Sequence, residues 1–158
     1  MSEDNLTILK GSEVPIDGLL GKRVLLVGYG NQGEAHAKNM KESGINVWVC
    51  TRQTERPIAD GFQVAPIEEA GHFDLVIIAL PDDVQKLYIS DQLIPNITPG
   101  TTVGFIHGFT VHYNLCEFPD GIGIVMVAPK GPGKTLRDAY KAGKGIPSLM
   151  AIHQENSQ

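Results

Sequence analysis

Lys22-Arg-Val-Leu-Leu-Val-Gly-Tyr-Gly-Asn-Gln-Gly33 is the stretch that decides the fold of this chain. Its apolar run, Val24 to Val27, has the length and the branched side chains of a buried strand. The run breaks into Gly28-x-Gly30-x-x-Gly33, and a helical pattern follows. Between a strand and a helix, this spacing is the fingerprint of a dinucleotide-binding turn.

Each glycine of the fingerprint has a separate physical reason. Gly28 lets the chain turn sharply out of the strand, Gly30 lets a pyrophosphate approach the backbone, and Gly33 lets the helix pack close to the sheet. The unpaired N–H groups at the start of the helix then favour a phosphate. The alternative interpretation is a glycine-rich turn in another kind of α/β protein.

The rest of the chain alternates between strand and helix patterns. Further strands are expected at Asn46–Cys50, Phe73–Leu80, Thr101–Ile106, Gly121–Val127 and Pro147–Ile152, and helices at Gln32–Ser43, Val84–Leu93 and Thr135–Ala142. Such alternation predicts a Rossmann-like α/β fold, with a doubly wound, mostly parallel sheet and helices on both faces. We expect a single domain over residues 22–152, a lead-in over 1–21 whose segment Pro15–Leu20 packs onto it, and a loose polar tail over 153–158.

Composition excludes several classes of protein. The net charge of −5 and the lack of a basic block argue against nucleic acid as a partner. No apolar stretch is long enough for a membrane span, and no apolar run follows a basic start as in a signal peptide. Cys50 and Cys116 lack metal or redox spacing, so a reducing, cytoplasmic location is expected.

The end of the second strand bears on the choice between NADP and NAD. NAD-binding proteins usually place an acidic residue there, which accepts hydrogen bonds from the ribose hydroxyls. This chain instead has Arg52, Thr54 and Arg56. Guanidinium and hydroxyl groups suit a 2′-phosphate, which favours NADP. Glu55 in the same loop keeps NAD open, and the arginines could also be solvated loop charges.

Leu80-Pro81-Asp82 follows the strand expected at Phe73–Leu80. Ligands of such sheets lie beyond the carboxyl ends of the strands, so Pro81 is expected beside the cofactor. Asp82 is expected to cap the next helix, because a carboxylate accepts from its free N–H groups. Gln85, one turn further, is expected to face the nucleotide.

Two further strand ends carry residues that can do chemistry. His107 lies between a strand and a glycine, where an imidazole can serve as acid or base near neutral pH. Lys130 lies in Ala-Pro-Lys-Gly-Pro-Gly133, whose prolines and glycines display the ammonium on a rigid loop. A fixed ammonium can stabilise a developing oxyanion. A structural histidine and a surface lysine are the alternatives.

Several of these motifs, in this order, resemble ketol-acid reductoisomerase. They are Gly28-Tyr-Gly-Asn-Gln-Gly33, Leu80-Pro-Asp-Asp-Val-Gln85, His107-Gly-Phe-Thr-Val-His-Tyr113, Met126-Val-Ala-Pro-Lys-Gly-Pro-Gly133 and Arg137-Asp-Ala-Tyr140, followed by Gly145-Ile-Pro147. The resemblance covers nearly the whole chain, from about Pro15 to Glu155. The His-Gly-Phe and Ala-Pro-Lys-Gly-Pro-Gly motifs are specific, whereas the glycine pattern alone is not.

The resemblance implies an activity and a set of site residues. The family converts 2-acetolactate to 2,3-dihydroxyisovalerate in valine and isoleucine synthesis, by a magnesium-dependent alkyl migration and a reduction by NADPH. His107 and Lys130 match its active-site histidine and lysine. The expected cofactor-binding residues are Gly28, Tyr29, Gly30, Asn31, Gln32, Gly33, Arg52, Thr54, Arg56, Leu80, Pro81, Asp82, Gln85, His107 and Gly133.

Members of the family also carry a second, helical domain, whose carboxylates bind two Mg²⁺ ions. This chain ends near the point where that domain would begin, so no metal ligand is expected within it. We therefore expect it to bind the cofactor without catalysing the isomerisation alone, with a separate helical domain or chain as a partner. A homodimer is possible. The alternatives are a stand-alone NAD(P)-binding or regulatory module and another Rossmann-type hydride-transfer dehydrogenase.

Overall fold

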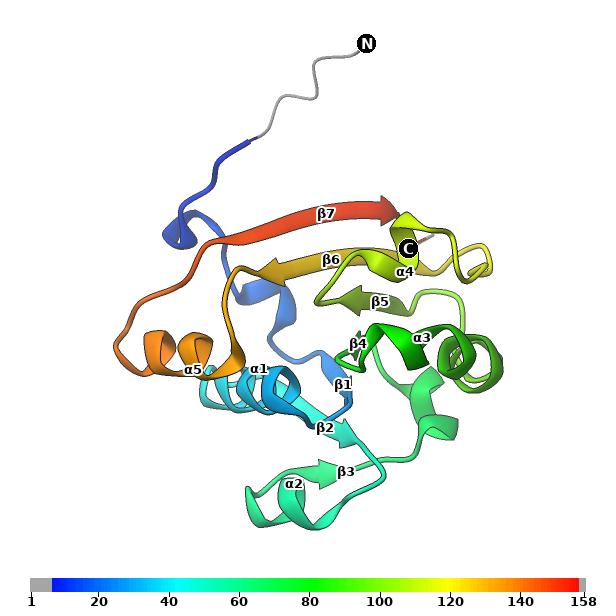
Figure 1. Cartoon of the computed structure of the whole chain (residues 1–158), viewed down its shortest axis with the longest axis horizontal. Coiled ribbons are helices and arrows are strands. Elements are labelled where there is room, and N and C mark those ends of the chain that lie inside the picture. Colours follow the sequence, from blue (N-terminus) through cyan, green and yellow to red (C-terminus); the bar gives the residue numbers. More distant parts are fainter. Residues whose placement is uncertain (1–6, 157–158) are drawn as a thin grey trace.

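A seven-stranded sheet, in the order β3-β2-β1-β4-β5-β6-β7, forms the centre of the computed structural model, which describes residues 7–156 (Figure 1). The strands are β1 (Arg23–Val27), β2 (Asn46–Cys50), β3 (Gln63–Val64), β4 (Leu75–Ile78), β5 (Thr102–Phe105), β6 (Gly123–Pro129) and β7 (Ser148–Gln154). Every neighbouring pair is parallel except β6 and β7. The expected Rossmann-like, mostly parallel sheet is thus confirmed.

The register of the central strands brings their carboxyl ends level with one another. Val27 at the end of β1 lies opposite Cys50 of β2 and Ile78 of β4, and Ile78 lies opposite Phe105 of β5. These strands are short, apolar and β-branched because both of their faces are covered. The loops that follow them are therefore gathered at one edge of the sheet.

Helices cover both faces of the sheet (Figure 1). The helices are α1 (Asn31–Glu42), α2 (Glu55–Ala59), α3 (Asp82–Tyr88), α4 (Phe109–His112) and α5 (Gly133–Lys141). On one face, Ala37 of α1 packs with Leu26 and Val49 of the sheet. On the other face, Ile89 and Leu93, in a π-helical turn after α3, join the larger cluster around Phe105. A doubly wound sheet has this arrangement.

Helix boundaries follow the sequence pattern closely, with one exception. Helix α1 begins and ends within one residue of its expected limits, and Gly44 follows it with a φ of +84°. The helix expected at Val84–Leu93 instead begins at Asp82 and changes from α to π geometry after Tyr88. Two short elements, β3 and α4, were not expected, because two to four residues show no measurable periodicity.

The two ends of the described chain differ from expectation. Ile16 and Leu20 of the lead-in are 41% and 49% exposed, so Pro15–Leu20 does not pack closely onto the domain. The last strand, β7, runs to Gln154, two residues beyond the expected limit. Asn156 donates to Gly100 O and Thr102 Oγ1, so the residues before 157 are not a loose tail. Residues 157–158 of the expected tail lie outside the described part.

Candidate cofactor site and family

The glycine turn lies where the strand order of the sheet reverses direction. From β1 the chain goes outward through β2 and β3, and it then returns to β4 on the other side of β1. Ligands of open α/β sheets bind at the carboxyl edge of such a switch point. The turn after β1 and the Leu80–Pro81 turn after β4 are neighbours here, since Ala79 N donates to Val27 O.

The three glycines of the turn are required for different reasons. Gly28 has a φ of +98°, and a Cβ on it would lie 2.8 Å from Ala79 O. A Cβ on Gly33 would lie 2.1 Å from Gly28 O. By contrast, a Cβ on Gly30 would meet no atom within 4 Å. Packing within the protein thus explains the first and third glycines, while the second leaves open space in which a phosphate can approach the backbone.

Helix α1 presents its N-terminus to this open space. Gly30 is its N-cap residue, so no side chain satisfies the first N–H groups. The first turn of a helix has free N–H donors and the positive end of the helix dipole, which together bind anions. Asn31 and Gln32 contribute these backbone donors. A pyrophosphate therefore fits the residues that are present.

The loop carrying Lys130 is attached to the start of α1. Gln32 Nε2 donates to Gly131 O at 2.9 Å, and a Cβ on Gly133 would lie 2.1 Å from Asn31 O. Gly133 is thus required by this close approach of two backbones, whatever it does toward a cofactor. Lys130 is exposed, and its N–H donates to Pro147 O at 2.8 Å. The backbone of the loop therefore lies next to the start of α1, and the loop carries an exposed lysine.

The loop after β2 contains two arginines, one of which forms an ion pair. Arg52 and Thr54 follow β2 directly, with Arg52 exposed and Thr54 half-buried. Arg56 instead forms an ion pair with Glu34 of α1 at 2.5 Å, and its guanidinium lies 5.9 Å from the centre of the Tyr29 ring. Among the described residues Arg52 forms no ion pair, whereas Arg56 is already paired with Glu34.

The side chain of Tyr29 belongs to the protein interior. It is 6% exposed, packs edge-on against Phe62 and donates its hydroxyl to Asp60 at 2.8 Å. Burial and this carboxylate raise the pKa of the Tyr29 hydroxyl. The same hydrogen bond, with Lys38 at 3.1 Å, lowers the pKa of Asp60. Only the backbone of Tyr29 remains a candidate contact.

Asp82 and Gln85 have roles that the sequence did not predict. Pro81 is the N-cap residue of α3, and no side chain caps that helix, so the expected capping by Asp82 is wrong. Gln85 is 1% exposed and bonded within the protein, so it does not face a nucleotide. The carboxylate of Asp82 instead lies 3.2 Å from His107 Nδ1, which brings the turns after β4 and β5 together.

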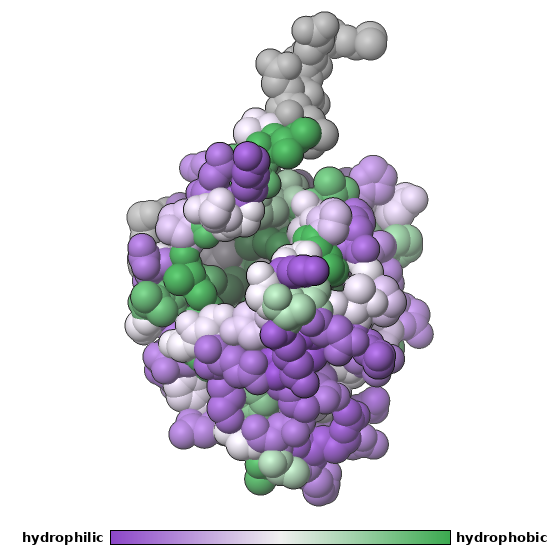
Figure 2. Space-filling view, turned by 90° about the vertical axis from the view of Figure 1, so that its left-hand side faces the viewer, coloured by the Kyte–Doolittle hydropathy of each residue, from purple (hydrophilic) through white to green (hydrophobic). Residues whose placement is uncertain are grey.

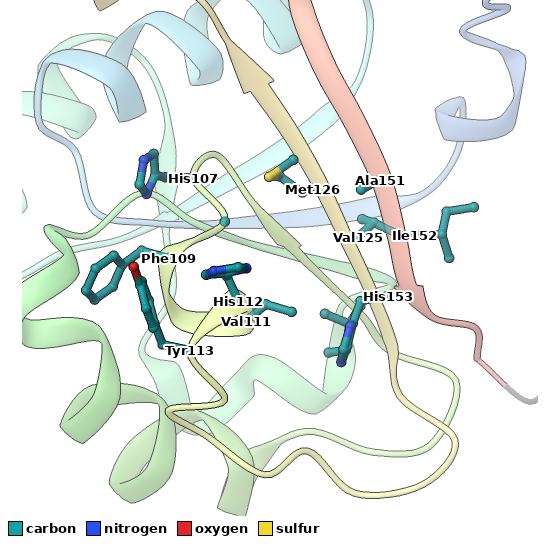
Figure 3. Close-up of a pocket in the computed structure, with 12 residues that line it drawn as sticks. His107, Phe109, Val111, His112, Tyr113, Val125, Met126, Ala151, Ile152 and His153 are labelled. Carbon is teal, nitrogen blue, oxygen red and sulfur yellow. The ribbon is translucent and has the colours of Figure 1, made fainter. Parts of the chain in front are cut away.

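His107 stands at one end of a hollow of about 560 Å³ between α4 and the β6–β7 pair. Its side chain is 62% exposed. Figure 3 shows His107 at one end of the labelled residues and His153 at the other, with Met126 and His112 among those between. On the face shown in Figure 2, apolar surface gathers in the upper part, above a mostly hydrophilic region. The hollow offers space beside an imidazole.

Thr110 is hydrogen-bonded to Gln85, and the sequence did not predict a role for it. It lies in α4, is 1% exposed and donates to Gln85 Oε1 at 2.6 Å. A threonine three residues after a histidine gives no signal by itself. Its position inside the His-Gly-Phe-Thr motif is the only indication that the sequence offers.

Comparison with known proteins agrees with this geometry. The family described as acetohydroxy acid isomeroreductase, NADPH-binding domain, matches residues 18–158. A ketol-acid reductoisomerase (NADP(+)) from Pyrobaculum arsenaticum is 39% identical over 155 residues, which are 95% of this chain and 47% of that protein. The enzyme of the same name from Methanopyrus kandleri is 41% identical over 148 residues, 90% of this chain and 45% of that protein. This chain thus spans about half the length of these relatives.

Solved structures give the same result for the fold. An NADH-preferring ketol-acid reductoisomerase from an uncultured archaeon superposes with a TM-score of 0.89 at 36% identity, over 94% of this chain and 48% of that one. An oxidoreductase from Jannaschia sp. CCS1 has a TM-score of 0.70 at 17% identity, over 86% of this chain and 54% of that one, and shows the fold alone. The family match covers most of the chain, and the glycine turn and the strand-end loops fit it. This chain therefore belongs to the NADPH-binding domain family of acetohydroxy acid isomeroreductases.

Proposed function

We propose that this chain binds NADPH and forms the cofactor-binding half of a ketol-acid reductoisomerase. The observation that carries the proposal is the open space at Gly30, which faces the free N-terminus of α1. Glycine is required there by no contact within the described residues, yet it is what a pyrophosphate needs. When bound, NADPH supplies a hydride.

In this proposal each strand-end loop has its own task. The N–H groups of Asn31 and Gln32 bind the pyrophosphate, and Pro81 bounds the cofactor on the β4 side. His107 and Lys130 belong to the reactive end, where an ammonium stabilises negative charge on a substrate oxygen and an imidazole donates or accepts a proton. Both side chains are exposed and therefore accessible to a small acidic substrate.

Preference for NADPH over NADH is also part of the proposal. Arg52 is exposed directly after β2, and Thr54 supplies a hydroxyl in the same loop. A guanidinium binds a phosphate in a fork-like geometry that the ribose hydroxyls of NADH cannot match. Arg56 contributes less, because Glu34 already pairs with it. Both cofactors occur in the names of the relatives, so the preference must be measured.

Calorimetric titration of the 158-residue chain with NADPH and with NADH tests these points. We expect NADPH to bind more tightly, and Arg52→Gln to lower the preference about tenfold, the value of one charge-assisted hydrogen bond. Lys144→Gln is the matched control, because this exposed lysine follows the far end of α5. Failure to bind either nucleotide would refute the proposed function. Equal effects of the two substitutions would refute only the role of Arg52.

The full reaction is proposed for this chain together with a second half. The relatives are about twice as long as this chain. No group of three or more His, Cys, Asp or Glu side chains that could hold a metal ion occurs among residues 7–156. We therefore propose that the Mg²⁺ ligands come from a helical partner, which covers the hollow beside His107.

A complementation assay tests the need for a partner. The chain is incubated with 2-acetolactate, NADPH and Mg²⁺, with and without a polypeptide corresponding to the remaining half of the Methanopyrus kandleri relative. Oxidation of NADPH is followed at 340 nm. We expect turnover only when both are present, and turnover by the 158-residue chain alone would show that the missing ligand set is not needed.

The place of action is proposed to be the cytoplasm. Cys50 and Cys116 are both free thiols, as expected in a reducing compartment. Within residues 7–156, none of the helices has the length and apolar character required to cross a bilayer.

A further inference from the structure

Two buried polar side chains lie behind His107. Gln85 and Thr110 are each 1% exposed, and besides Thr101 they are the only polar residues in the buried set of the described chain. Burying an amide or a hydroxyl without a partner costs free energy, so such groups are retained where their hydrogen bonds fix something. Neither is part of the expected catalytic pair.

The amide of Gln85 is fully engaged and can point in only one way. Its Nε2 donates to Leu80 O at 2.8 Å and to Asp82 Oδ1 at 3.2 Å, and its Oε1 accepts from Thr110 Oγ1 at 2.6 Å. The reverse orientation would place the amide oxygen against a carbonyl and a carboxylate, which are acceptors only. Gln85 therefore joins the turn after β4 to helix α4.

This arrangement continues through Asp82 to the imidazole. One carboxylate oxygen of Asp82 accepts from Gln85, and the other, Oδ2, lies 3.2 Å from His107 Nδ1, which is within ion-pair distance. A hydrogen bond to one ring nitrogen decides which nitrogen of a neutral histidine carries the proton. The His107 side chain is otherwise largely open to solvent, with 62% of it exposed.

We propose that Asp82 is a positioning residue, held in place by Gln85 and Thr110. It keeps His107 in the Nδ1–H tautomer, so that Nε2 is available to a ligand. In this chain the carboxylate does not cap α3 and lies beside His107. It sets the ring of His107 so that Nε2 accepts a proton when neutral and donates one when charged. The use of Nε2 in proton transfer rests on the proposed function, whereas the tautomer of His107 does not.

Nitrogen-15 NMR of the histidine rings tests the proposal on the 158-residue chain. The chemical shifts of Nδ1 and Nε2, recorded at a pH where the ring is neutral, give the ratio of the two tautomers. We expect the Nδ1–H form of His107 to dominate. In Asp82→Ala the ratio should fall about tenfold, the value of one hydrogen bond to a charged group.

Matched variants separate positioning from general damage to α3. Asp83→Ala removes an exposed carboxylate from the same first turn and should leave the ratio unchanged. Thr110→Val should lower the ratio by a smaller factor, and Thr110→Ser, which keeps the hydroxyl, should restore it. A dominant Nε2–H form in the unchanged chain, or an unchanged ratio in Asp82→Ala, would overturn the proposal.

Titration with NADPH on the same variants keeps the two proposals distinguishable. Asp82→Ala should alter the dissociation constant by less than about threefold, since positioning acts on the imidazole and not on the phosphates. If the tautomer ratio changes in Asp82→Ala but the unchanged chain binds no nucleotide, the proposed function is refuted and the positioning role of Asp82 is supported. A loss of NADPH affinity in Asp82→Ala as large as in Gly30→Val would instead make Asp82 a binding residue and overturn its positioning role.

Discussion

At the scale of single residues, the glycines of the turn after β1 differ in what surrounds them. Gly28 and Gly33 are fixed by backbone atoms that lie within 3 Å of where a Cβ would stand. Gly30 is surrounded by open space. All three belong to one sequence pattern, so the pattern alone does not separate their roles. The distinction needs the neighbouring atoms.

Substitution of Gly30 by valine should remove cofactor binding and preserve stability. A Cβ at this position would meet no atom within 4 Å, so the side chain would extend into the open space over the N-terminus of α1. Hydrogen bonds to a charged group are worth about 1.5–3 kcal/mol each, so the loss of one corresponds to roughly 10- to 150-fold weaker binding. Calorimetry gives the affinity and urea unfolding gives the stability. Equal NADPH affinity in Gly30→Val would place the pyrophosphate elsewhere.

His36 predicts how stability depends on pH. It is mostly buried in α1, its Nε2 has no partner among the described residues, and burial lowers its pKa below the usual 6.5. The unfolded chain therefore binds a proton at a higher pH than the folded one. The free energy of unfolding should therefore be undiminished by His36 above pH 6.5, and it should decrease as the pH falls below that value.

Replacing His36 with leucine should remove this part of the pH dependence. Urea unfolding midpoints measured between pH 8 and pH 5 should fall less steeply in His36→Leu than in the unchanged chain. The exposed histidine of β7 provides the control, because His153→Leu should leave the slope unchanged. Parallel slopes in the unchanged chain and His36→Leu would show that the ring is solvated in the folded state.

At the scale of elements, the decisive contact is the close packing of α1 onto the end of β1. Helix α1 starts so near the turn that Gly33 touches Gly28 O. On its outer side α1 pairs with α5, where Arg137 bonds to Asn39 and Glu42 and the hydroxyls of Ser43 and Tyr140 meet at 2.8 Å. The N-terminus of α5 lies beside the start of α1, because the backbone of Gly133 approaches that of Asn31.

Gly33→Ala should therefore destabilise the domain although alanine favours helices. The added Cβ would lie 2.1 Å from Gly28 O, and because both atoms belong to the backbone, α1 must move away from the sheet. Overpacking of this kind costs about 1–3 kcal/mol or more. Gly145→Ala, where a Cβ meets nothing within 4 Å, should change stability by less than about 0.5 kcal/mol. Urea unfolding compares the two, and equal effects would contradict the close packing.

At the scale of the whole molecule, one edge of the sheet is left largely uncovered. Strand β7 is antiparallel to β6 and forms the edge, with Met150 at 53% and Ile152 at 70% exposure. Val127 of β6 is 46% exposed beside them. Exposed apolar groups that lie together on a sheet edge favour association. The hollow beside His107 is continuous with this edge, because Ile152 and His153 line it.

We expect the isolated chain to self-associate through this edge at high concentration. Met150→Asp together with Ile152→Asp should shift sedimentation velocity profiles toward the monomer, because a carboxylate at the contact must be desolvated. Ile58→Asp, on α2 at the other side of the sheet, is the control with equal charge per site and should have little effect. A monomeric unchanged chain at all concentrations would refute the prediction.

Local rules were sufficient for much of the fold. Strand β1, the glycine turn and helix α1 were predictable to within one residue, because an apolar run, a φ above zero and a helix start are set by neighbours in the sequence. His107 and Lys130 could be named from the strand ends and the family motifs, and they follow the adjacent strands β5 and β6. Their catalytic roles remain predictions.

The sequence by itself determined the order of the longer strands and helices and the family, and it predicted the carboxyl edge of the sheet as the place of the site. Only the tertiary structure decided that Asp82 faces His107 and not the end of α3, that Gln85 and Thr110 stand behind it, and that Tyr29 is buried against Phe62. The physical reason is distance along the chain. These partners are 25 or more residues apart, so no local pattern records them, and they meet only when parallel strands bring their ends to one edge.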